Sequence, residues 1–155
     1  MNLEGVIKVY SLETYDRSLV LIFEDFGGDS LPQLISKNSK VQGMVMPLEK
    51  ILKIAIQITE ILSRIHNHNI IHKDINPSNI IFNAETEQVK IIDFGISSIT
   101  TNESLILNES NVLEGTFAYI SPEQTGRMNR PLDYRTDFYS LGITFYELLT
   151  GQLPF

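Results

Sequence analysis

The stretch that decides the fold is His72–Asn79, which reads HKDINPSN. Asp93-Phe94-Gly95 follows it further along the chain, directly after a short apolar run. The carboxylate of Asp93 and the side-chain amide of Asn79 offer hard oxygen ligands of the kind that Mg²⁺ prefers, and they can approach a metal ion from two directions. Asp74 is then left to accept a hydrogen bond from an incoming hydroxyl group and to orient that group.

A third stretch, Gly115-Thr116 followed by Ser121-Pro122-Glu123, completes the pattern. Each motif alone is weak evidence, because Asp-Phe-Gly occurs often by chance and residues such as Asp74 and Asn79 also serve in turns and caps. The ordered set is far more specific, and it consists of Asp74, Asn79, Asp93, Glu123 and Asp137. In this order and at these separations, the three stretches resemble the catalytic loop, the metal-binding loop and the end of the activation segment of eukaryotic-type Ser/Thr protein kinases.

Hydrophobic patterning predicts the elements at the start of the chain. Two β-branched-rich runs, Val6–Tyr10 and Leu19–Phe23, are separated by polar residues and predict the strands of a hairpin. Leu31–Ile35 predicts a short helix with an acceptable N-cap in front of it. The polar residues 36–46 predict a loop.

A second set of elements surrounds the His72–Asn79 motif. From Pro47 onward, apolar residues recur at three-and-four spacing, which predicts an amphipathic helix that ends at residues 67–69. Residues 80–82 and 89–92 predict another hairpin, and the weakly patterned residues 97–114 predict a long functional loop.

The C-terminal part predicts one more helix, over residues 137–150, with Thr136 as its cap and Gly151 as its stop. This helix is apolar nearly all round, so we expect it to be buried, with Phe138, Phe145 and Tyr146 in the core. Gly142 is expected to allow close helix packing. His66 and His68, at the end of the preceding helix, show no partner pattern and are expected at the surface.

Composition limits the possible functions. The chain has 155 residues, 43% of them hydrophobic, which predicts a single domain with one modest core. The formal net charge is −7 and no block of Lys and Arg occurs, so nucleic-acid binding is not expected. There is no Cys, which excludes disulfides and Cys-based metal sites. No signal peptide and no apolar run long enough for a membrane span are seen, so a cytoplasmic protein is expected.

The resemblance to Ser/Thr protein kinases covers essentially the whole chain and implies its fold. The implied fold is α+β and protein-kinase-like but incomplete, with the hinge strands of the small lobe and most of the helical large lobe. Residues 1–28 would form the end of the small lobe and the hinge. Residues 29–155 would form a truncated large lobe, so that 1–155 is a partial protein kinase domain.

The same resemblance implies roles for individual residues. Asp74 would be the catalytic base, with Lys73 and Asn79 as further catalytic residues. Asn79 and Asp93 would hold Mg²⁺, and Thr116 would help to dock a Ser or Thr substrate. Backbone groups of two hinge residues would bind the adenine of ATP: Glu24 and Phe26.

Five residues would have structural roles by the same resemblance. His72 would pack against Phe94, and Gly95 would provide the hinge of the Asp-Phe-Gly loop. Glu123 would pair with an arginine further along a complete domain. Asp137 would anchor the backbone of the catalytic loop from the C-terminal helix.

The chain departs from the kinase pattern in several places. It has no Gly-rich phosphate loop, no upstream strand lysine for the α- and β-phosphates, and no helix glutamate to pair with that lysine. Lys73 replaces the usual arginine, and a lysine cannot grip a phosphate with a planar bidentate fork. Asn76 stands where Ser/Thr kinases typically place a lysine near the transferred phosphate. This polypeptide alone is therefore expected to be a very poor kinase.

Three hypotheses follow from these observations. In the first, the parent protein is a protein serine/threonine kinase that uses ATP and Mg²⁺ to phosphorylate protein substrates, and this chain is a fragment. In the second, the chain is a kinase-like regulatory or binding module that does not phosphorylate. In the third, it is a truncated remnant that folds poorly. The segment SPEQTGRMNRPLDYRTDFYSLG is similar to kinase modules at the N-terminus of large sensor histidine kinase/ATPase signalling proteins, which implies further signalling domains.

Overall fold

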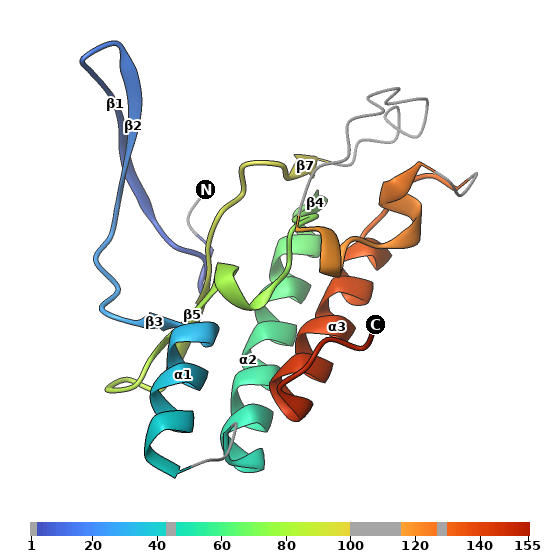
Figure 1. Ribbon diagram of the computed structural model, residues 1–155. Coiled ribbons are helices and arrows are strands. Elements are labelled where there is room, and N and C mark those ends of the chain that lie inside the picture. The colour runs from blue at the N-terminus through green and yellow to red at the C-terminus, as the bar shows by residue number, and fades with distance from the viewer. Residues whose placement is uncertain (1–2, 43–45, 100–115, 127–129) are drawn as a thin grey trace.

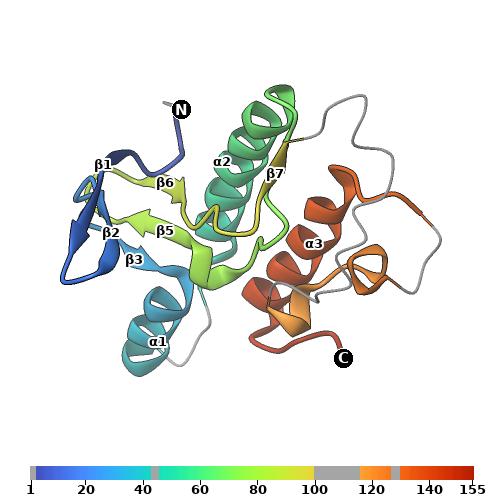
Figure 2. The same cartoon turned by 90° about the horizontal axis from the view of Figure 1, so that it is seen from above.

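The computed structural model describes residues 3–42, 46–99, 116–126 and 130–155, with only the backbone described for 38–42. The fold is mixed α+β, as predicted. Figure 2 shows a small three-stranded sheet beside helix α2 (Leu48–Asn67), with helix α3 (Arg135–Thr150) on the other side of that helix. A separate hairpin stands apart from the helices (Figure 1).

That hairpin consists of β1 (Val9–Tyr15) and β2 (Ser18–Phe23), which pair antiparallel. The hairpin prediction is confirmed, but the predicted first strand lies too early in the chain. Asp16 and Arg17 both have positive φ, as a tight two-residue hairpin turn requires, and this turn places the polar residues before it inside β1. Val6 pairs instead with Ile91 in an isolated parallel bridge.

Helix α1 (Leu31–Gln42) follows a two-residue strand, β3 (Asp29–Ser30). The predicted helix exists but is longer than expected, so the prediction of a loop beginning at residue 36 is wrong. Polar residues can continue a helix on its solvent side, because each added residue contributes a backbone hydrogen bond. The side chain of Gln33 accepts a hydrogen bond from the Ser30 N–H at 3.0 Å and helps to fix the start of the helix.

Helix α2 forms the centre of the core and confirms the clearest prediction from periodicity. Its buried side chains recur at three-and-four spacing: Ile51, Ile54, Ile58, Ile61, Leu62 and Ile65. They pack in one cluster with apolar residues of α1 and of the sheet, including Leu31, Ile80 and Ile91. This cluster supports the loop that follows α2.

The three-stranded sheet has the order β3-β5-β6. Strands β5 (Ile80–Asn83) and β6 (Gln88–Ile91) form the predicted second hairpin, with Ile80 opposite Ile91. Two very short strands, β4 (Ile70–Ile71) and β7 (Ser98–Ile99), pair antiparallel and were not predicted. They flank the segment of the chain that contains both the HKDINPSN and the Asp-Phe-Gly motifs. Most of residues 97–114, the predicted long loop, lies outside the described residues.

Helix α3 corrects several predictions. It begins at Arg135 with Tyr134 at the cap position, so Thr136 is not the cap and its side chain is instead fully buried. Phe138 and Tyr146 are 47% and 45% exposed, so neither lies in the core, although the Phe138 ring contacts those of His66 and Tyr134. A Cβ at Gly142 would meet nothing within 4 Å, so this glycine does not permit close packing here. Among the described residues, no helix is long and apolar enough to span a membrane.

Candidate active site

The His72–Asn79 loop connects β4 to the 3₁₀ helix η1 (Pro77–Asn79). Asn76 caps this short helix, because its Oδ1 accepts a hydrogen bond from the Ser78 N–H at 2.9 Å, and Pro77 suits the first position. Ile75 is fully buried in the core. The loop is therefore fixed at its centre by an apolar contact and at its end by a cap.

The carboxylate of Asp74 is held by three N–H donors. Oδ1 accepts from Asn76 Nδ2 and from the Thr116 backbone N–H, both at 3.0 Å. Oδ2 accepts from Asn79 Nδ2 at 2.9 Å. Three of the predicted site residues, Asp74, Asn79 and Thr116, are thus brought into direct contact. Asn76 was noticed in the sequence only as a missing lysine, and its contact with Thr116 Oγ1 at 3.2 Å could not be read from spacing.

Asn79 and Asp93, the predicted Mg²⁺ ligands, each carry a side-chain oxygen that could hold a metal ion. Both side-chain hydrogen bonds of Asn79 use its Nδ2 atom, and its side-chain oxygen Oδ1 accepts none from any residue that the structure describes. Asp93 is exposed and has a φ of 63°, and the residue before it donates its N–H to the Asn79 carbonyl at 3.0 Å. Nearby, the Gly95 N–H donates to Asp93 Oδ1 at 3.1 Å. Such oxygens suit Mg²⁺, which commonly takes its other ligands from phosphate and water.

His72 is fully buried beneath this site. Its Nε2 lies 3.1 Å from the Ile92 carbonyl, and its Nδ1 lies 3.3 Å from the Asp74 N–H. These partners require a neutral ring, with the proton on Nε2 and an acceptor at Nδ1. Burial lowers the pKa of His72 below its usual value, despite the opposing effect of Asp137. The ring also contacts Phe94, with 4.6 Å between the centroids.

Asp137 lies on α3, is fully buried and holds the backbone of the same loop. Its Oδ2 accepts from the His72 N–H at 2.9 Å, and its Oδ1 accepts from the Lys73 N–H at 2.7 Å. Lys73 has a φ of 70°, a strained conformation for a residue with a side chain. The carboxylate therefore stabilises a backbone geometry that the loop would not adopt by itself.

The expectation that His66 lies at the surface is wrong. Its side chain is 11% exposed, and its Nε2 lies 2.8 Å from Asp137 Oδ2. The sequence indicated this burial, because His66 lies about one helical turn after Leu62 and about two turns after Ile58, and so shares their buried face. His68, in contrast, is exposed, and its ring bonds the carbonyl of Arg64.

The segment after Thr116 packs against α3. The Tyr119 hydroxyl donates to the Glu147 carboxylate, and Ser140 Oγ donates to the Tyr119 carbonyl at 2.7 Å. Burial raises the pKa of Tyr119, and the neighbouring Glu147 raises it further. Glu123, predicted to pair with an arginine, makes no ion pair within the described ranges. Residues 116–126 are called the docking segment here, because Thr116 is the predicted substrate-docking residue. The contacts of Tyr119 fix this segment relative to the helix that carries Asp137.

Glu24 and Phe26, the predicted hinge residues, lie away from these contacts and next to Lys90 of β6. The Glu24 side chain pairs with Lys90 and accepts from the Lys8 N–H at 2.7 Å, and the Lys90 contact is the main cause of its lowered pKa. The Phe26 carbonyl accepts from Asn83 Nδ2 at 2.7 Å. The Phe26 N–H and the Glu24 carbonyl have no hydrogen-bond partner among the residues with described positions.

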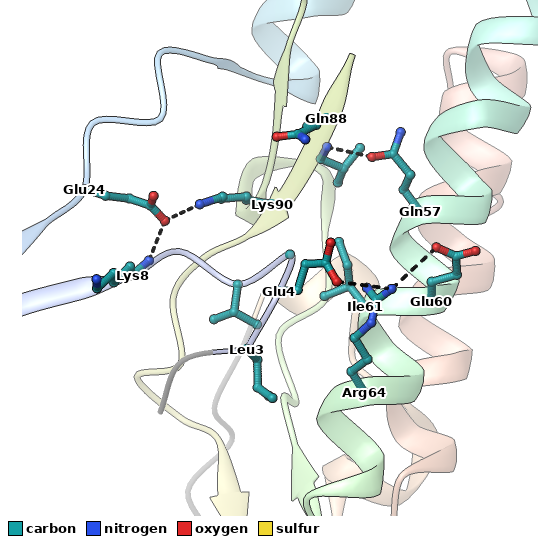
Figure 3. A pocket seen from close by; sticks show the side chains of 13 residues that line it. Leu3, Glu4, Lys8, Glu24, Gln57, Glu60, Ile61, Arg64, Gln88 and Lys90 are labelled. Carbon is teal, nitrogen blue, oxygen red and sulfur yellow. Dashed lines mark hydrogen bonds and ion pairs between the residues drawn. The ribbon is translucent and has the colours of Figure 1, made fainter. Parts of the chain in front are cut away.

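A cavity of about 330 Å³ lies on another side of the molecule, between the N-terminal segment, β6 and α2 (Figure 3). Figure 3 shows partners for five of its charged side chains: Glu24 pairs with Lys90, and Arg64 pairs with Glu4 and Glu60. Its lining includes none of the residues of the His72–Asn79 loop. Of the predicted site residues the lining includes Glu24, whose carboxylate pairs with Lys90, so we do not assign the phosphate-transfer chemistry to this cavity.

Comparison with known proteins agrees with these motifs. The family described as "Protein kinase domain" matches residues 1–155. A probable serine/threonine-protein kinase of Clostridium acetobutylicum is 35% identical over 151 residues, which cover 97% of this chain and 22% of that protein. Serine/threonine-protein kinase pkn3 of Myxococcus xanthus is 35% identical over 147 residues, covering 90% of this chain and 25% of the relative.

A plant protein is similar over the same region. Serine/threonine-protein kinase STY46 of Arabidopsis thaliana is 31% identical over 152 residues, covering 98% of this chain and 24% of the relative. The chain thus spans between 22% and 25% of the length of these three curated relatives. On the match to the family over its whole length, and on the relatives at 35% identity, the chain belongs to the protein kinase domain family.

Proposed function

We propose that the protein to which this chain belongs is a serine/threonine protein kinase, and that this chain supplies its catalytic loop. Protein kinases in general transfer a phosphoryl group from ATP with the help of Mg²⁺. The observation that best supports the proposal is the Asp74 carboxylate, which three N–H donors hold beside an Asn79 amide oxygen that has no partner in the described chain.

The proposed reaction uses these residues as follows. Asp74 accepts a hydrogen bond from the Ser or Thr hydroxyl of a protein substrate and orients its oxygen towards the γ-phosphorus of ATP. A bond forms between that oxygen and the phosphorus, the bond from the phosphorus to the β–γ bridging oxygen breaks, and the hydroxyl proton passes to Asp74. Asn79 and Asp93 would hold Mg²⁺, which when bound neutralises charge on the phosphates. Thr116 lies beside Asp74, where a substrate hydroxyl would dock.

Other assignments remain proposals of the same kind. Residues 1–28 are proposed as the end of a small lobe with its hinge and residues 29–155 as the large lobe, which is supported by the separate β1–β2 hairpin. Backbone groups of Glu24 and Phe26 are proposed to bind adenine. A cytoplasmic location, where ATP is available, and further signalling domains in the same protein are proposed as well.

The test is phosphate transfer from radiolabelled ATP by the full-length protein. Asp74→Asn should lower the rate roughly 100-fold or more, because a positioned general base typically contributes that much. Asp133→Asn is the matched control, since Asp133 pairs with Arg135 at the start of α3 and makes no contact with Asp74. Full activity of the Asp74→Asn protein would contradict the proposal.

One observation favours a second candidate, a kinase-like module that binds nucleotide without transferring phosphate. Asn76 is only 2% exposed, and its amide bonds Asp74 and Thr116, so this position offers no positive charge to a phosphate. A thermal shift with Mg-ATP but no transfer to any protein, including itself, would favour this candidate. Transfer that depends on Asp74 would exclude it.

A further inference from the structure

Gln124 connects the end of the docking segment to the catalytic loop, a contact that no sequence motif indicated. It lies in the 3₁₀ helix η3 (Pro122–Thr125), and its Nε2 donates to the Lys73 carbonyl at 2.8 Å. Its Oε1 accepts from the Ser121 N–H and from Thr136 Oγ1, both at 3.1 Å. One side-chain amide therefore contacts the catalytic loop, its own short helix and α3.

The partners fix the orientation of this amide. The Ser121 N–H is a donor and must face the oxygen, whereas the Lys73 carbonyl is an acceptor and must face the nitrogen. Ser121 and Thr136 are fully buried, and their hydroxyl groups also contact each other. A flipped amide would oppose donor to donor and acceptor to acceptor, so only one arrangement satisfies both sides of Gln124.

Gln124 holds a carbonyl of the strained backbone that Asp137 does not contact. Asp137 accepts the N–H groups of His72 and Lys73, and the His72 ring accepts the N–H of Asp74 at 3.3 Å. The Lys73 carbonyl belongs to the peptide that leads directly into Asp74. Asp137 holds the N–H groups around the strained φ of 70° at Lys73, and the Gln124 bond restrains rotation of the peptide on the C-terminal side of this residue.

We propose that Gln124 is a positioning residue that fixes the Lys73–Asp74 peptide, and with it the direction of the Asp74 carboxylate. This inference rests on the proposed kinase function. The docking segment then grips the catalytic loop at two points, through the Thr116 N–H on Asp74 and through Gln124 on Lys73. The contact of Gln124 is a neutral hydrogen bond to the Lys73 backbone carbonyl, so it needs neither the Lys73 side chain nor a phosphate group.

A simpler role must be separated from this one, because Gln124 also closes a capping box with Ser121. Gln124→Glu makes the separation, since glutamate keeps an oxygen for Ser121 and Thr136 but has no N–H for the Lys73 carbonyl. Gln124→Lys is the complementary variant, because it keeps an N–H donor of similar reach and loses the capping oxygen. Both variants are made in the full-length protein.

Two readouts are compared with those of the native protein. The first is kcat and KM for phosphate transfer, and the second is hydrogen–deuterium exchange of the peptide containing residues 72–74. For Gln124→Glu, kcat should fall about tenfold or more with little change in the KM for ATP, since a small misplacement of a reacting group has such effects. Exchange at residues 72–74 should become about tenfold faster. Gln124→Lys should restore most of the protection and of kcat.

The outcomes separate this inference from the proposed function. If the native protein transfers phosphate and Gln124→Glu changes neither kcat nor exchange, the positioning role is refuted. The same conclusion holds if kcat falls without faster exchange at residues 72–74. It also holds if Gln124→Lys is as impaired as Gln124→Glu, because restoring an N–H donor would then not restore the loop. If the native protein transfers no phosphate but Gln124→Glu still accelerates exchange at residues 72–74, the backbone clamp stands and the kinase function fails.

Discussion

Replacing Asp137 with asparagine tests the contact on which the catalytic-loop geometry depends most. The carboxylate is completely buried and accepts hydrogen bonds from two backbone N–H groups and from the ring of His66. An asparagine has one acceptor oxygen and one NH₂ group. Its oxygen would take the place of Oδ2, which serves two donors, and the NH₂ group would then face the Lys73 N–H.

The expected loss of stability follows from this substitution. A hydrogen bond to a charged group contributes about 1.5–3 kcal/mol, and the variant loses one and leaves a buried N–H without an acceptor. We therefore expect the free energy of unfolding to fall by about 2–4 kcal/mol. Since whole domains are stable by only about 5–15 kcal/mol, this is a large fraction of the total. At roughly 2–4 °C per kcal/mol for a domain of this size, the Tm should fall by about 10 °C.

The assay is urea unfolding followed by circular dichroism, with hydrogen–deuterium exchange at residues 72 and 73. The matched control is Asp133→Asn, because Asp133 bonds the largely exposed Arg135 and such pairs contribute at most about 1 kcal/mol. Exchange should accelerate in the Asp137 variant and remain unchanged in the control. If Asp137→Asn is no less stable than Asp133→Asn, the argument that this carboxylate holds the loop is wrong.

Two further predictions concern protonation and backbone conformation. The pKa of buried His72 is lowered, so below about pH 6.5 the unfolded chain binds a proton that the folded chain does not. The free energy of unfolding should therefore fall from pH 7 to pH 5, by up to ~1.4 kcal/mol per pH unit. His72→Phe should reduce this slope in Tm against pH, and an unchanged slope would refute the assignment. Gly142→Ala should stabilise the protein by up to about 1 kcal/mol, since a Cβ there meets nothing within 4 Å. Gly5→Ala should destabilise the protein by about 1–3 kcal/mol, because φ of Gly5 is +84° and the new Cβ would lie 2.2 Å from Ile61 Cγ1. Equal melting temperatures for the two glycine variants would contradict both expectations.

The sequence predicted those parts of the fold whose signal is local. The three-and-four spacing after Pro47 predicted α2, because a helix that buries one face must repeat its apolar residues with the helical period. The apolar runs on either side of residues 83–88 predicted the β5–β6 hairpin in the same way. The order of the three motifs predicted that Asp74, Asn79 and Thr116 belong to one site, and the structure brings them into contact.

The incorrect predictions have a common physical cause, which is that burial and hydrogen bonding depend on elements that lie elsewhere in the sequence. Phe138 and Tyr146 look like core residues in the sequence, but a residue is buried only where another element covers it. His66 and Thr136 look like surface and cap residues, but each hydrogen-bonds a side chain far away in the sequence. Gln124 was missed for the same reason, since its partner Lys73 precedes it by 51 positions.

The contacts that orient the catalytic loop and those of the proposed nucleotide hinge belong to separate parts of the chain. In the described structure, every side chain that holds Asp74, or the peptide before it, lies between residues 72 and 137. The β1–β2 hairpin supplies none of these contacts, and it exposes large apolar side chains such as Tyr15 at 77% and Leu19 at 74%. A two-stranded ribbon of this kind is marginally stable in water, so hydrogen exchange should be fastest there and slowest in α2. Substitutions in the hairpin should therefore affect nucleotide binding and aggregation while leaving the geometry of Asp74 intact, which is why binding and transfer of phosphate need to be measured separately.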